Sequence, residues 1–75
     1  MSGRLRQVTA DEAARVARML GFVLARQKGS HASYKRAADQ RLVVIPMHRG
    51  NLKPGTLHRI LKDLNLSPDE FAELL

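Results

Sequence analysis

The spacing of hydrophobic residues changes period along this chain, and each change predicts a new element. From residue 9 onward, apolar side chains recur at the spacing of one helix face, at Ala13, Val16, Ala17 and Leu20. Thr9 and Glu12 form a capping box that would begin this helix, and Gly21 supplies a left-handed position that would end it. The pattern therefore predicts an amphipathic helix that ends near residue 20.

After this helix the pattern becomes that of β-structure. Residues 22–25 form a short apolar run, and residues 42–45 form a stronger one that Pro46 would end. Between them the chain alternates, with His31, Ser33 and Lys35 on one side and Ala32, Tyr34 and Arg36 on the other. The side with Tyr34 is the better core, so we expect the helices to cover it and the side with His31 to face outward.

Helical spacing returns after the loop at 47–51. Pro54 suits a first helical turn, and the apolar positions of this second helix are Leu57, Ile60, Leu61 and Leu64. Asn65 can end the helix, and Ser67 with Glu70 forms a capping box that opens a short terminal helix. Because hairpin-length connections join the strands, we expect one α+β domain over residues 1–75, with a three-stranded antiparallel sheet and helices on one face.

Charge narrows the choice of partner. The chain carries a formal net charge of +6, but residues 13–62 hold eleven Lys/Arg and only one acid, Asp39, a local net charge of +10. Such a field favours polyanions, so nucleic acid is the expected partner, although a basic surface kept for solubility would show the same composition. The 75 residues include no cysteine and no apolar run long enough to span a bilayer, and we expect a cytoplasmic protein that binds no membrane.

Three histidines are the candidates for chemistry. Their spacing, with no carboxylate close by, does not suit a metal site. His31 directly follows the turn Lys28-Gly29-Ser30, where a phosphate could approach the backbone, and Lys28 and Lys35 flank it. A neutral imidazole held there could remove the proton of an RNA 2′-hydroxyl. On spacing alone, a structural role for this histidine is the alternative.

Four motifs give the chain a resemblance to a known family. They are GFVLARQKGSHASY at 21–34, IPMH at 45–48, LKPGTLHRILKDLNLS at 52–67 and DEF at 69–71. In this combination and order the chain resembles the HicA-type (YcfA-like) toxins of bacterial and archaeal toxin–antitoxin pairs, whose fold is similar to that of double-stranded-RNA-binding domains. The resemblance implies a metal-free endoribonuclease that cleaves mRNA without a cofactor and is inhibited by a HicB-type antitoxin.

The resemblance also assigns roles to residues. The family's catalytic histidine falls on His31. We expect contacts with RNA from the residues that surround it, namely Arg26, Lys28, Gly29, Ser30, Lys35 and Arg36. The group that protonates the leaving 5′-oxygen stays open between His48, Tyr34 and His31 itself acting through water.

Two other functions are compatible with the same residues. One is an RNA-binding module of this fold that holds RNA through its basic face and cleaves nothing. The other is a protein-interaction domain whose basic surface meets an acidic partner. Loss of RNA cleavage on replacing His31 would distinguish the nuclease from both.

Overall fold

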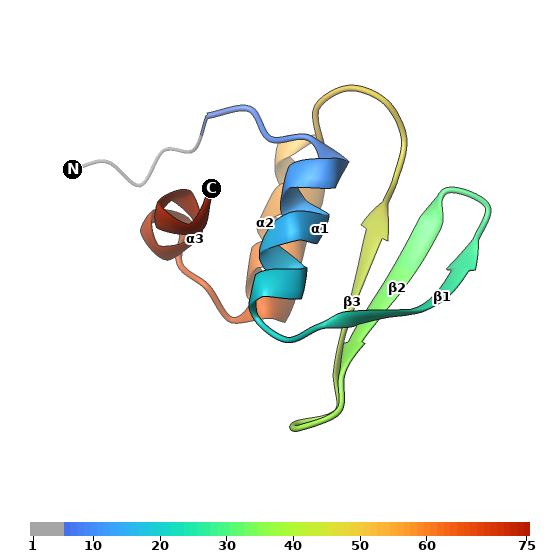
Figure 1. The fold of residues 1–75 in the computed structure, drawn as a ribbon. Coiled ribbons are helices and arrows are strands. Elements are labelled where there is room, and N and C mark those ends of the chain that lie inside the picture. The colour runs from blue at the N-terminus through green and yellow to red at the C-terminus, as the bar shows by residue number, and fades with distance from the viewer. Residues whose placement is uncertain (1–5) are drawn as a thin grey trace.

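The computed structural model describes residues 6–75 as three strands and three helices (Figure 1). In chain order they are α1 (Ala10–Met19), β1 (Val23–Lys28), β2 (His31–Arg36), β3 (Arg41–Pro46), α2 (Pro54–Leu64) and α3 (Pro68–Leu74). This order confirms the α+β class. The first five residues of the domain expected over residues 1–75 lie outside the described part of the chain.

The three strands form one antiparallel sheet in the order β1-β2-β3. Ala32 and Tyr34 of β2 are buried, as are Val43 and Ile45 opposite them on β3, whereas His31 and Lys35 are exposed. Since neighbouring strand residues point to opposite faces, the helices cover the Tyr34 side. The expected orientation of β2 is confirmed, and the other side of the sheet, which we call the open face, carries His31, Ser33 and Lys35.

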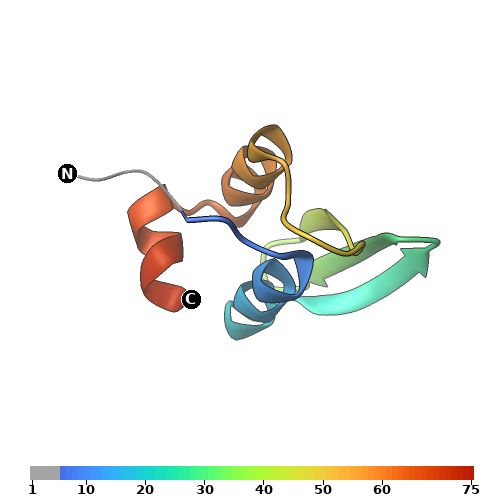
Figure 2. The ribbon, with the colours of Figure 1, turned by 90° about the horizontal axis from the view of Figure 1, so that it is seen from above.

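The first strand forms near the apolar run at 22–25 but extends beyond it, to Lys28. All six residues of β1 are exposed, and only Phe22, just before it, is buried. Both α1 and α2 pack against β3, so β1 lies at the sheet edge remote from α2 (Figures 1 and 2). A register shift between Leu24 and Arg26 marks a bulge in this edge strand.

The helices are set by their apolar faces and by their caps. Figures 1 and 2 show α1 and α2 on the same side of the sheet, with α3 farther from it. Phe71 joins α3 to the shared core. Both expected capping boxes form, at Thr9 and at Ser67, and Asn65 takes the left-handed conformation that ends α2. None of the described helices is long and apolar enough to cross a membrane.

A two-residue turn at Gly29 and Ser30 joins β1 to β2. Gly29 has φ of 59°, which glycine adopts without steric cost and which a primed hairpin turn requires at its first central position. The turn pairs Lys28 directly with His31. The geometry of this turn therefore determines where β2 begins and where the His31 imidazole lies.

Arg36 holds the other end of β2 to the first helix. Its guanidinium donates to the carbonyl of Leu20 at 2.8 Å, pairs with Asp39 at 2.9 Å and stacks over the ring of Phe22 at 4.6 Å. Hydrogen bonds from Arg36, and then from the backbone of Arg41, lower the pKa of Asp39 to about 2. Arg36 thus ties the β2–β3 connection to the end of α1.

The lowered pKa of Asp39 makes its effect on stability dependent on pH. A carboxylate with a depressed folded-state pKa stabilises above its unfolded pKa, and this contribution disappears as the pH falls toward about 2. We expect Asp39→Asn to lower the melting temperature at pH 7, by a small amount because the pair is partly exposed. Circular dichroism melts should show the difference from wild type shrinking between about pH 4 and pH 2. A difference that is undiminished at pH 2 would contradict the assigned pair.

Two glycine-to-alanine substitutions should have opposite effects on the free energy of unfolding. A Cβ at Gly29 meets nothing within 4 Å, so Gly29→Ala should cost about 1–2 kcal/mol through its positive φ alone. Gly55 lies in α2, also with open space at its Cβ, so Gly55→Ala should stabilise by about 0.4–1 kcal/mol. Urea denaturation measures both, and a stabilising Gly29→Ala would contradict the turn geometry.

Candidate functional site

His31 begins β2 and projects from the open face of the sheet. It is paired with Lys28 on β1 and with Pro46 on β3, and directly opposed residues point to the same face. The three residues therefore form a row across one end of the open face. An imidazole at this position is reachable from solvent and has a cation beside it.

The end of β3 brings a second imidazole to the same region. The backbone N–H of Met47 donates to the carbonyl of Ser30, so the pairing of β2 with β3 continues beyond His31. His48 follows at once. It is exposed, and its Nδ1 lies 3.4 Å from the carbonyl oxygen of Arg49.

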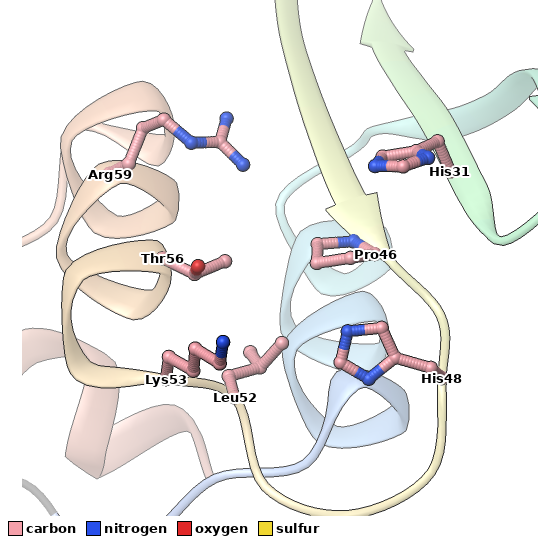
Figure 3. A pocket seen from close by; sticks show the side chains of 7 residues that line it. All are labelled: His31, Pro46, His48, Leu52, Lys53, Thr56 and Arg59. Carbon is pink, nitrogen blue, oxygen red and sulfur yellow. The ribbon is translucent and has the colours of Figure 1, made fainter.

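Both histidines line one pocket of about 250 Å³ at the β3 edge of the sheet, where one side of α2 borders the open face (Figure 3). Its lining consists of His31, Pro46, His48, Leu52, Lys53, Thr56 and Arg59. The volume lies below the roughly 300–1,000 Å³ that is typical of pockets for small molecules. A hollow of this size suits one phosphate and its neighbouring sugar from a longer polymer.

One side of α2 forms the pocket wall that faces His31. Lys53, Thr56 and Arg59 are spaced three residues apart, so they follow one side of the helix (Figure 3). Arg59 donates to the backbone carbonyl of Val44 at 3.1 Å, which fixes α2 against the edge of β3. Its guanidinium also lies 3.5 Å from Asp63 on the next turn of the helix.

This wall is not predicted from the sequence. The spacing of the buried positions predicts α2 but gives no role to the other side of the helix. The available signal was the same three-residue spacing of Lys53, Thr56 and Arg59, together with a first turn that contains no acid. Spacing alone could not show that this side shares a pocket with His31, because the pocket depends on how α2 packs on β3.

The electrostatics of the pocket favour an anion. Every titratable side chain that lines it is a base: His31, His48, Lys53 and Arg59. In contrast to α1 and α3, α2 begins without a side-chain cap and with no acid in its first turn. The positive end of its dipole adds to the side-chain charges. The pocket can therefore hold a phosphate between two imidazoles and two permanent cations.

The other expected RNA contacts lie outside this pocket. Lys28 is adjacent to His31 across the strand pair, with Gly29 and Ser30 in the turn. Arg26 pairs with Ser33 farther along the open face, and Lys35 is near its opposite end. Within residues 6–75, the salt bridges take Arg6, Arg36, Arg41 and Arg59 and leave these open-face cations without an acidic partner.

Two expected site residues lie on the helix-covered side of the sheet. Tyr34 is only 5% exposed and belongs to the hydrophobic core. Arg36 points to the same side, where its guanidinium is engaged by Asp39 and Leu20. Neither lines the pocket of His31, because both are an odd number of residues from it along the strand.

The donor set of the pocket does not resemble a metal site. Among residues 6–75, no group of three or more His, Asp or Glu is arranged to hold a metal ion. The pocket supplies two imidazoles, a hydroxyl and two cations, and none of its lining residues is a carboxylate. This set suits proton transfer beside a phosphate.

Comparison with known proteins assigns the family. The family model described as HicA toxin of bacterial toxin–antitoxin matches residues 10–66. A search of the curated proteins finds no match. The matched stretch runs from the start of α1 to the residues after α2 and includes every residue that lines the pocket. The match covers more than half of the chain, which therefore belongs to the HicA toxin family of bacterial toxin–antitoxin systems.

Proposed function

We propose that this toxin is an endoribonuclease that cleaves mRNA without a metal ion, with His31 as the general base. The observation that carries the proposal is the convergence of His31 with His48 and with the basic side of α2 on one small pocket (Figure 3). A phosphodiester in this pocket would have an imidazole beside it and permanent cations around it. These are the groups that RNA cleavage through its own 2′-hydroxyl requires.

The positions of these groups support the following reaction. His31 takes the proton of a 2′-hydroxyl, and the resulting oxygen attacks the adjacent phosphorus. Negative charge then grows on the phosphate oxygens, where Lys53 and Arg59 oppose it. Proteins usually hold Mg²⁺ at phosphates through carboxylates, which the residues lining this pocket do not include. We therefore assign the stabilisation of charge to side chains.

The surface around the pocket suggests how the RNA is held. Arg26, Lys28 and Lys35 are exposed on the open face and have no acidic partner among residues 6–75. The chain has three aromatic residues, Phe22, Tyr34 and Phe71, and all three are buried. Stacking of bases on these three rings is thus not available, and we expect contacts with phosphates to dominate binding.

Family membership implies a cognate antitoxin. We propose a HicB-type antitoxin that presents acidic side chains to the basic pocket and covers His31. Such a partner would inhibit by excluding the RNA backbone from the groups that cleave it. An mRNA substrate and its control by an antitoxin would place this activity in the cytoplasm.

The test is an RNA cleavage assay in excess EDTA. Wild type should cleave, and His31→Ala should lose at least roughly 100-fold in rate, as expected for removal of a general base. His58→Ala is the matched control, because His58 is exposed on α2 and does not line the pocket. Circular dichroism of all three proteins would show that the fold is retained.

Two outcomes would overturn the proposal. Full activity in a folded His31→Ala variant would exclude His31 as the base. Salt-sensitive RNA binding without cleavage by wild type would instead favour the non-catalytic binding module, for which Lys28→Ala and Lys35→Ala should weaken binding while His31→Ala should not.

A further inference from the structure

We propose that His48 is the second acid–base group of this toxin and donates the proton to the leaving 5′-oxygen. This inference rests on the proposed function, since it assigns a further catalytic residue to the same reaction. The sequence leaves open which group protonates the leaving 5′-oxygen, and this proposal assigns that group.

The backbone holds His48 at a short and defined distance from His31. Pro46 is the direct partner of His31 across β2 and β3, and His48 follows two residues later. Antiparallel partners have Cα atoms about 5 Å apart, and two residues of extended chain span about 7 Å. These spans place the two histidine Cα atoms no more than about 12 Å apart, within the reach of two imidazoles that approach one phosphate.

The side chains agree with this placement. Both imidazoles contribute to the lining of the same pocket, with Pro46 between them and α2 opposite (Figure 3). The bond from the Met47 N–H to the Ser30 carbonyl fixes the two strand ends against each other. A phosphate that contacts Lys53 and Arg59 would therefore have one imidazole on the side of β2 and the other on the side of the β3–α2 loop.

The other groups near this phosphate are poor proton donors. Imidazoles ordinarily titrate near pH 6.5, whereas ammonium and guanidinium groups hold their protons at neutral pH. This argues against Lys53, Arg59 and Lys28 as the acid. The hydroxyl of Thr56 is a weaker acid still. Tyr34 is buried on the opposite side of the sheet and cannot reach the pocket.

A second hollow indicates which side of the phosphate His48 serves. It adjoins the loop after β3 and the start of α1, and it is lined by Thr9, Ala10, Asp11, Met47, His48, Arg49 and Gly50. His48 lines both hollows, whereas His31 lines only the first. We place the nucleoside that carries the leaving 5′-oxygen in this second hollow, so that this oxygen lies on the side of His48.

The proton balance of the step is complete with these two residues. Neutral His31 takes the proton of the 2′-hydroxyl, and a bond forms between the 2′-oxygen and phosphorus. The bond between phosphorus and the 5′-oxygen breaks, and protonated His48 gives its proton to that oxygen. The products are a 2′,3′-cyclic phosphate and a 5′-hydroxyl, while His31 ends protonated and His48 neutral. Exchange of protons with water restores both.

The test compares two leaving groups. One oligoribonucleotide has an ordinary cleavage site, and its twin has sulfur in place of the bridging 5′-oxygen, which leaves as a thiolate without a proton. His48→Gln should cut the ordinary substrate at least roughly 100-fold more slowly than wild type and the sulfur substrate within about 10-fold of it. His31→Gln should slow both substrates, and His58→Gln should slow neither.

Each other outcome contradicts the assignment. Equal losses on both substrates would make His48 a residue that only positions RNA, and no loss on either would exclude it from the reaction. His48→Asn provides a second variant, and circular dichroism would check that both are folded. If wild type in EDTA cleaves neither substrate, the proposed nuclease itself fails, and the assignment of His48 fails with it.

Discussion

The pairing of β2 with β3 is the constraint on which the pocket depends. Its register sets Ala32 against Ile45 and Tyr34 against Val43 on the helix-covered side, where all four are buried. The same register sets His31 against Pro46 on the open face. A shift of one residue would exchange the two faces of β2 and bury His31 in the core. Burial of apolar side chains thus also fixes where the imidazole lies.

The packing of α2 then completes the pocket. Its buried positions, Leu57, Ile60, Leu61 and Leu64, determine which side of the helix meets the sheet. Thr56 directly precedes a buried position and Arg59 directly precedes the next, so both side chains emerge at the border of the packed face. The bond from Arg59 to the Val44 carbonyl uses a backbone acceptor at the edge of the sheet. One arginine therefore both fixes the helix and charges the pocket.

Local patterns predicted most of the fold because local physics determines it. The capping boxes at Thr9 and Ser67, the left-handed Asn65 and the alternation of β2 each follow from a few neighbouring residues. The exposure of β1 could not be predicted from neighbouring residues, because an apolar run does not reveal that its strand lies at the sheet edge away from α2. Arg36 was expected to contact RNA from its charge alone. Its place beside Phe22 and Leu20 depends on how the end of α1 meets the sheet.

The same limit applies to the site. His31 could be identified because the turn, the glycine and the flanking lysines are contiguous in sequence, whereas the α2 wall comes from residues more than twenty positions away. The fold distributes the positive charges of the chain unevenly. Arg6, Arg36 and Arg41 lie beside acids away from the pocket. In the pocket wall Arg59 lies 3.5 Å from Asp63, but Lys28 and Lys53 have no salt bridge within residues 6–75. Positive charge is therefore left unbalanced around the two imidazoles, and a bound polyanion would relieve repulsion among these groups. The composition shows an excess of positive charge, but only the packed structure concentrates it at one pocket.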